Sequence, residues 1–401
     1  MISGEPRQSR DTHLAAIAAR ATAPAFERPR SIFRSLLAIL RWFSVNFLIF
    51  AVLAELMCVV FVHRKSWPST RPTYHLNYNQ FWADIYPAFG TWHRPDGPFT
   101  HQGGCFSVEY RTNSYGARDS ERNRRSMEPR TIVLGDSFVE GFGLSDEQRL
   151  SNILERRTGR EHLNFGSGGN FSPLQYFLVY KSMAQEFDHD LVVVGVLPDN
   201  DFHEMDLTWG RKHLAGRYRP YYAKDLSIVY EGRLRTNTSE TTWDHVEAFL
   251  RAYLASYHVG QYLNSLAYWH SLTPYSGYND YDDVDLTRLK KALSDLGETA
   301  TARGSKVAVF LIPRLIDFER LQATGSNRLG PAMEQWGQQA QIPIKDLLPE
   351  MARRSQGDYR SYFLPCDGHW SKRGNEVAAE IVGGWLYGRN PVADGQTLGK
   401  P

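Results

Sequence analysis

The chain has few cysteines, almost no net charge and no internal repeats. Three cysteines in 401 residues exclude a disulfide-built scaffold, and no C-x-x-C pair suggests a zinc site. A net charge of +2 is too small to indicate nucleic acid or an acidic polymer as a partner. The absence of repeats excludes a solenoid. With 42% hydrophobic and 22% charged residues, the composition is that of a globular protein.

One apolar stretch near the N-terminus departs from this composition. Residues 43–62 read FSVNFLIFAVLAELMCVVFV, and Glu55 is the only charged residue among them. About 20 apolar residues are needed to cross a bilayer. A core helix usually keeps a polar face, and a cleaved signal peptide lies closer to the N-terminus than this run does. We therefore predict a transmembrane signal anchor at 43–63.

The expected organisation follows from this anchor. Arginines are slightly more frequent before it than basic residues are after it, which favours a cytoplasmic tail at 1–42. Residues 64–130 are interpreted as an extracytoplasmic connecting segment, and its charged end RDSERNRRSMEPR (118–130) as a solvated connection. A folded domain is expected at 131–390.

Strand and helix signals alternate throughout that domain. Capping boxes at 145–148 and 172–175 predict two helix starts, and leucines from 286 to 296 predict a third helix. A final helix is expected at 371–387. Buried strands are predicted at the short apolar runs 131–135, 162–166, 191–197, 306–313 and 342–348. This alternation predicts an α/β fold with three layers, α/β/α, around a mostly parallel, flavodoxin-like sheet.

Ligands of such sheets bind beyond the carboxyl ends of the strands. Ser137 follows the first strand in Gly-Asp-Ser, where a serine suits a nucleophile whose intermediate develops an oxyanion. The glycine-rich segment 164–173 and Asn200 follow the second and third strands, and both could supply hydrogen-bond donors. Turn chemistry alone explains each of these motifs equally well.

A histidine near the C-terminus completes the set. His369 precedes the last helix and lies two residues after Asp367, which is the composition of a base with an orienting carboxylate. One histidine among thirteen would mean little by itself. The combination of four motifs in this order is more specific than any one of them.

In this order, G-D-S, N-x-G-x-x-G, N-D and D-x-H resemble the SGNH hydrolase superfamily, also called GDSL-like lipases and esterases, over about residues 130–387. YRTNSYGARD (110–119) resembles a segment that often precedes this domain in membrane-anchored bacterial members. The resemblance implies an inner-membrane, single-pass protein with a periplasmic hydrolase domain and no cofactor. It implies Ser137 as nucleophile, His369 as general base and Asp367 as its acid. The oxyanion donors would be the Ser137 and Gly169 N–H groups and the Asn200 side chain.

Some alternatives remain open. The family usually has Asp three residues before His, where this chain has Cys366, so another carboxylate could replace Asp367. Acidic residues between 199 and 206 invite a metal site, but no known metal motif is present. The chain could transfer an acyl group to a sugar as a polysaccharide O-acetyltransferase, or bind glycans without catalysis. Cys105 and Cys366 are either paired or free.

The long section at about 203–284 bears on the substrate. It is rich in tyrosine and tryptophan, whose flat faces and polar edges match sugar rings, although most of these rings could equally fill a small core. It has no continuous aliphatic run of the kind that would hold a long acyl chain. We therefore expect the substrate to be an O-acetylated carbohydrate of the cell envelope, and envelope polysaccharide machinery as a possible partner.

Overall fold

The computed structural model describes residues 30–64, 81–234, 242–260, 263 and 275–388, except positions 96, 103, 104 and 366. The chain divides into two units, residues 1–59 and 60–401. Most of helix α2 (Arg30–Arg64) belongs to the first unit. Its segment Arg34–Phe61 is long and apolar enough to span a membrane, and an 18-residue window within it has a mean hydropathy of 2.3. The helix begins earlier than the expected anchor, so the end of the expected tail is helical.

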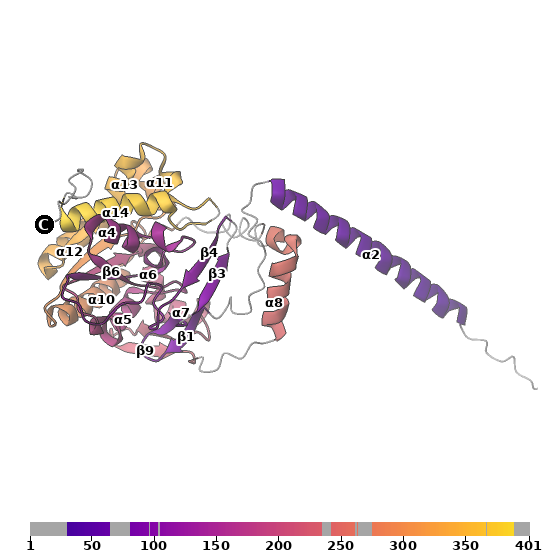
Figure 1. Ribbon diagram of the computed structural model, residues 1–401, viewed down its shortest axis with the longest axis horizontal. Helices are drawn as coiled ribbons and strands as arrows, with labels where there is room; N and C mark the ends of the chain where they lie inside the picture. Colours follow the sequence, from indigo (N-terminus) through magenta and orange to yellow (C-terminus); the bar gives the residue numbers. More distant parts are fainter. Residues whose placement is uncertain are drawn as a thin grey trace, which may run out of the picture. The chain divides into compact units, whose positions relative to one another are not determined.

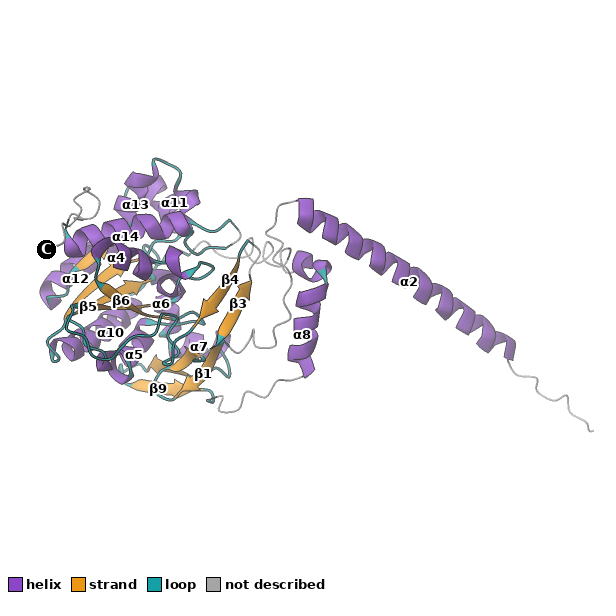
Figure 2. Ribbon diagram, in the orientation of Figure 1, coloured by secondary structure: helices purple, strands orange, loops and turns teal. Residues whose placement is uncertain are grey.

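The second unit contains a five-stranded sheet of parallel strands in the order β11-β10-β7-β5-β6 (Figures 1 and 2). When these five strands are renumbered 1 to 5 along the chain and read from the β6 edge, the order is 2-1-3-4-5, which is the flavodoxin-like arrangement. The predicted fold class is therefore confirmed. The strands are β5 (Arg130–Gly135), β6 (Glu161–Gly166), β7 (Leu191–Val196), β10 (Lys306–Leu311) and β11 (Ile344–Asp346).

Helices cover this sheet in two groups: α4 packs against α14, and α5 packs against α10 (Figure 1). Apolar residues of the central strands, such as Ile132, Val193 and Val309, are fully buried between the layers. The helices are α3 (Ser137–Glu140), α4 (Leu150–Thr158), α5 (Pro173–Ser182), α6 (Pro198–Glu204), α7 (Leu207–His213), α8 (Thr242–Tyr253), α10 (Asp283–Thr301), α11 (Leu315–Thr324), α12 (Leu329–Ala340), α13 (Leu348–Ser355) and α14 (Lys372–Tyr387). Short 3₁₀ turns are η2 (Asp146–Gln148), η3 (Ala184–Glu186) and η4 (Tyr359–Tyr362).

In the part of the chain that the structure describes, three antiparallel pairs of strands lie outside the main sheet. Trp92 and Phe89, at the first of these pairs, are fully buried in the main core cluster, so residues upstream of 131 contribute to the core. The pairs are β1 (Trp82–Tyr86) with β2 (Gly90–His93), β3 (Pro98–Gln102) with β4 (Ser107–Arg111), and β8 (Arg219–Tyr222) with β9 (Ile228–Glu231).

The expectation that 118–130 is solvated is wrong at its start. Arg118, Asp119 and Arg122 are buried. The Arg118 guanidinium donates hydrogen bonds to the Glu140 carbonyl at 2.9 Å and the Gly141 carbonyl at 2.7 Å, and so satisfies the carbonyls at the end of α3. The charge-rich composition is misleading because these charges have internal partners.

The capping box at 145–148 does not open an α-helix directly. It opens the 3₁₀ turn η2, and α4 begins at residue 150.

Candidate active site

Ser137 is the first residue of α3, directly after β5. The helix starts there because the Asp136 side chain accepts a hydrogen bond from the Phe138 N–H at 3.0 Å and caps it. The helix packs closely on the next strand, since a Cβ at Gly166 would lie 2.5 Å from the Glu140 nitrogen. Glycine at 166 therefore allows α3 to present Ser137 at the carboxyl edge of the sheet.

Asp136, next to the serine, is a cap and not a partner of the histidine. Burial raises its pKa to about 8, with the nearby Glu204 and Glu140 carboxylates adding to the effect. The residue is 1% exposed, and this raised pKa favours the protonated form at neutral pH. Its side chain caps α3 by accepting from the Phe138 N–H, so Asp136 serves the turn that holds Ser137.

His369 faces the serine from the loop before α14. Ser137 Oγ lies 2.7 Å from His369 Nε2, although 232 residues separate the two in sequence. The loop is held by a backbone hydrogen bond from the Leu364 N–H to the His369 carbonyl at 2.8 Å. Ser371 then caps α14 by accepting a bond from the Gly374 N–H.

Asp367 contacts the other nitrogen of the same ring. Its Oδ1 is hydrogen-bonded to His369 Nδ1 and accepts a second bond from the His369 backbone N–H at 3.0 Å. This tight turn explains how a two-residue spacing reaches Nδ1. Burial opposes ionisation of Asp367, but the hydrogen bond and charge of His369 outweigh it and lower the pKa of the carboxyl group. A carboxylate only accepts, so Nδ1 carries the proton and Nε2 is free to accept from Ser137.

Of the expected oxyanion residues, Gly169 lies in the loop after β6 and Asn200 lies in the element that follows β7; these two strands flank β5. Gly169 has a φ of +74°, and a Cβ there would lie 2.9 Å from Trp82 Cβ, so only glycine fits. Asn200 lies in the first turn of α6, where a plain turn was expected. The structure connects the two loops through Glu204, whose Oε1 accepts from Asn170 Nδ2 at 2.9 Å and from Asn200 Nδ2 at 3.2 Å.

Sequence reasoning missed a buried cluster around Glu140. Its carboxylate accepts hydrogen bonds from Trp82 Nε1 at 3.2 Å and from the Gly168 N–H, and it lies 3.1 Å from His93 Nε2. Burial opposes its ionisation, but the charge and hydrogen bond of His93 and the charge of Arg118 outweigh it and lower the pKa of Glu140. The only local signal was an acidic residue inside the apolar run after Ser137. The cluster ties the upstream strands to the loop that carries Gly169.

The acidic residues between 199 and 206 each have a separate role. Asp199 pairs with Arg314, Asp201 accepts a bond from the Tyr176 hydroxyl at 2.8 Å, and Asp206 caps α7. Among the described residues, no group of three or more His, Cys, Asp and Glu side chains is placed to hold a metal ion. Cys105 is disulfide-bonded, whereas Cys58 is free, and Cys366 lies outside the described residues.

No protein-family model and no curated protein matches the sequence. Among solved structures, a lipase/acylhydrolase from Enterococcus faecalis is similar at 12% identity and a TM-score of 0.36, over 65% of this chain and 97% of that one. A member of the lipolytic protein G-D-S-L family from Veillonella parvula DSM 2008 is similar at 11% identity and a TM-score of 0.34, over 65% and 98%. A GDSL-like lipase from Bacteroides thetaiotaomicron VPI-5482 is similar at 11% identity and a TM-score of 0.33, over 65% of this chain and 89% of that one. At these scores the likeness bears on neither activity nor substrate.

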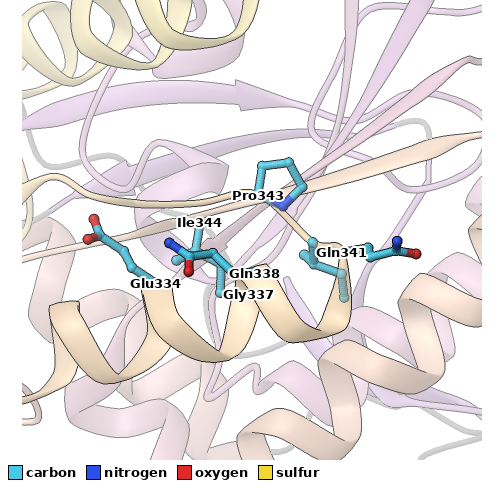
Figure 3. Close-up of a pocket in the computed structure, with 7 residues that line it drawn as sticks. Glu334, Gly337, Gln338, Gln341, Pro343 and Ile344 are labelled. Carbon is cyan, nitrogen blue, oxygen red and sulfur yellow. The ribbon is translucent and has the colours of Figure 1, made fainter.

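A surface hollow elsewhere in the domain is separate from this site (Figure 3). It lies between α12 and the segment that precedes β11, at the amino end of that strand, whereas Ser137 lies at the carboxyl edge of the sheet. The residues lining it are Glu334, Gly337, Gln338, Gln341, Ile342, Pro343 and Ile344. It offers no pair of acid and base groups for catalysis.

Proposed function

We propose that this chain is a serine ester hydrolase that works through an acyl-enzyme. The observation that carries the proposal is the chain of hydrogen bonds from Ser137 through His369 to Asp367. A hydroxyl, a base and an orienting carboxylate in this order form the arrangement that activates serine for acyl transfer. In this proposal Asp367 is the triad acid, despite the short spacing.

The reaction proceeds in two halves. Ser137 Oγ attacks the ester carbonyl while His369 Nε2 takes its proton, and the oxyanion is held by the Ser137 and Gly169 N–H groups and the Asn200 amide. His369 then gives the proton to the leaving alcohol. Water, activated by the same nitrogen, attacks the acyl-enzyme and releases the acid. If a sugar hydroxyl replaces water, the same site transfers the acyl group, so a sugar acceptor that accelerates acetyl release would indicate transfer.

The proposed substrate is an O-acetylated carbohydrate of the cell envelope. Of the aromatic residues in the section 203–284, Tyr222, Tyr278 and Tyr281 are buried in the main core cluster, as the plainer interpretation expects. His203, Trp209 and Tyr275 form a half-buried ring cluster beside α6, the helix that carries Asn200. Such rings suit the C–H faces of a sugar. Tyr262, Tyr268 and Trp269 lie outside the described residues.

Selectivity tests the substrate assignment. The full chain in detergent is given acetylated oligosaccharides and, separately, a long-chain ester, and acid release is measured for both. We expect faster release from the acetylated sugar and a raised KM for that substrate in Trp209→Ala. A preference for the long chain would refute the carbohydrate assignment and leave the serine mechanism standing.

The proposed location of the hydrolase domain is the periplasm, with α2 as an inner-membrane anchor. The support is the apolar segment Arg34–Phe61 and the excess of arginine before it. An alkaline phosphatase fused after residue 401 should be active in a bacterial host. An inactive phosphatase, together with an active cytoplasmic reporter at the same position, would invert the topology.

A further inference from the structure

Glu204 is a buried carboxylate between the two loops that flank Ser137. The residue is 1% exposed. One of its oxygens, Oε1, accepts hydrogen bonds from both Asn170 and Asn200, at 2.9 Å and 3.2 Å between oxygen and Nδ2. A buried carboxylate without partners would be strongly unfavourable. These bonds therefore belong to a built arrangement and not to a surface contact.

Arg219, on β8, supplies the countercharge. It is fully buried, and its Nη2 lies 3.6 Å from Glu204 Oε2. The same guanidinium donates to the Asn170 carbonyl and to Gln175 Oε1, the latter at 2.9 Å. Because the Glu204–Arg219 pair is neutral as a whole, it places no net negative charge beside a developing oxyanion. Arg219 also fixes the backbone at Asn170, directly after Gly169.

The hydrogen bond that Asn200 donates to Glu204 decides which way the Asn200 amide faces. A carboxylate can only accept, so the nitrogen of Asn200 must face it. The Asn200 oxygen is buried and has no hydrogen-bond partner among the described residues. Rotation of the amide would place this oxygen against the Glu204 carboxylate, which also can only accept, so Glu204 opposes the rotation. The second N–H of Asn200 thereby remains available as a donor.

We propose that Glu204 is a positioning residue, which fixes the Asn200 amide as an oxyanion donor without touching the substrate. This inference rests on the proposed esterase function. Glutamine at 204 can donate as well as accept, so it would permit the rotated Asn200 amide, whose oxygen would repel the oxyanion. The defect should therefore fall on turnover and not on substrate binding.

A double-mutant cycle tests the proposal with the full chain and a chromogenic acetyl ester. Removing one oxyanion donor typically costs on the order of 10²–10³ in kcat, which is the loss expected for Asn200→Ala. For Glu204→Gln we expect a fall in kcat of roughly 10–100-fold, with KM changed less than about threefold. In the Asn200→Ala background, the effect of Glu204→Gln should shrink by at least about fivefold, because both changes remove one function. Glu231→Gln is the matched control, since Glu231 is part-exposed and pairs with the exposed Arg211.

Thermal unfolding separates positioning from folding. If Glu204→Gln does not fold, Glu204→Asp is measured instead, because it keeps the charge opposite Arg219 but ends one methylene short of the asparagines. A folded Glu204 variant with wild-type kcat, or an effect undiminished in the Asn200→Ala background, overturns the positioning role. Turnover that persists in Ser137→Ala overturns the esterase proposal itself, and that result does not depend on Glu204.

Discussion

Phe142 lies flat against the imidazole of His369, with ring centroids 4.0 Å apart and ring planes 17° apart. The Phe142 ring also contacts the rings of His101 and Phe106 edge-on, with centroid separations of 4.4 Å and 5.6 Å. His101 lies on β3, and Phe106 directly precedes β4. The segment upstream of the hydrolase domain therefore reaches the proposed base through the Phe142 ring.

Removing this ring should loosen the base. Phe142→Ala is expected to lower kcat by roughly 3–10-fold, since an aromatic pair contributes about 0.5–1.5 kcal/mol beyond its buried area. Phe142→Tyr keeps the ring and should remain close to wild type. Steady-state rates with an acetyl ester provide the comparison. Equal kcat for all three proteins would mean that the stack does not orient His369.

Asp367 should matter both to turnover and to stability in acid. Asp367→Asn leaves the ring without its orienting carboxylate and should lower kcat by on the order of 10⁴-fold. The pKa of Asp367 is lowered in the folded state, because the contacts with His369 outweigh its burial. Its stabilising effect is therefore complete above its ordinary pKa of about 3.9 and is lost as pH falls through the lowered value.

The stability advantage of the wild type over Asp367→Asn should therefore shrink below about pH 4. Thermal unfolding of both proteins across that range measures it. If Asp367→Asn turns over at nearly the wild-type rate, the role of triad acid passes to another carboxylate.

His101 should make the fold sensitive to mild acid. Burial lowers the pKa of His101 to about 3, so the ring is neutral in the folded protein, whereas the unfolded chain binds a proton near pH 6.5. Between these values the unfolded state holds more protons, and the free energy of unfolding falls as pH falls, by at most about 1.4 kcal/mol per pH unit.

His101→Gln should flatten this slope, because glutamine does not titrate and can still reach the Tyr110 hydroxyl that His101 contacts at 2.8 Å. Denaturant unfolding at pH 7, 6 and 5 provides the measurement, with the exposed His213→Gln as control. An unchanged slope in His101→Gln would place the acid sensitivity elsewhere.

Much of this architecture was predictable because it is encoded locally. The strands β5, β7 and β10 are short apolar runs, and Ser172, which begins a capping box, precedes α5 as expected. Parallel strands bring the loops that follow them to the carboxyl edge of the sheet. Motifs far apart in the chain can therefore be grouped from the sequence alone. For that reason Ser137, His369 and Asp367 could be chosen together.

The supporting residues could not be predicted in this way. Glu140 contacts Trp82, which lies 58 residues earlier, and Arg219 contacts Gln175, which lies 44 residues earlier. No spacing rule relates such positions, since the contacts depend on how the upstream strands and the section after β7 pack against the sheet. Composition predicts solvent exposure for charges such as Arg118, because it does not reveal an internal partner.

We expect the disulfide partner of Cys105 to be Cys366, which directly precedes Asp367 in the sequence. Cys105 is bonded, Cys58 is free, and the chain has three cysteines. Mass spectrometry of non-reduced peptides from protein exported through the membrane should find the peptides of Cys105 and Cys366 linked. Reduction is expected to lower kcat, since Phe106 beside Cys105 contacts the Phe142 ring that stacks on His369. Free thiols at both positions would end this prediction.

The most direct test of the account is the rate of acetyl ester hydrolysis by the full chain in detergent, with and without the Ser137 hydroxyl. Ser137→Ala and His369→Ala should each lower kcat by on the order of 10⁴-fold or more, because the serine and its base act as one unit. Ser137→Ala should unfold at nearly the wild-type temperature, since it removes a single hydroxyl, whereas His369→Ala also loses the contacts with Asp367 and Phe142 and should unfold at a lower temperature. A folded Ser137→Ala protein that hydrolyses the ester at the wild-type rate would contradict the mechanism as a whole.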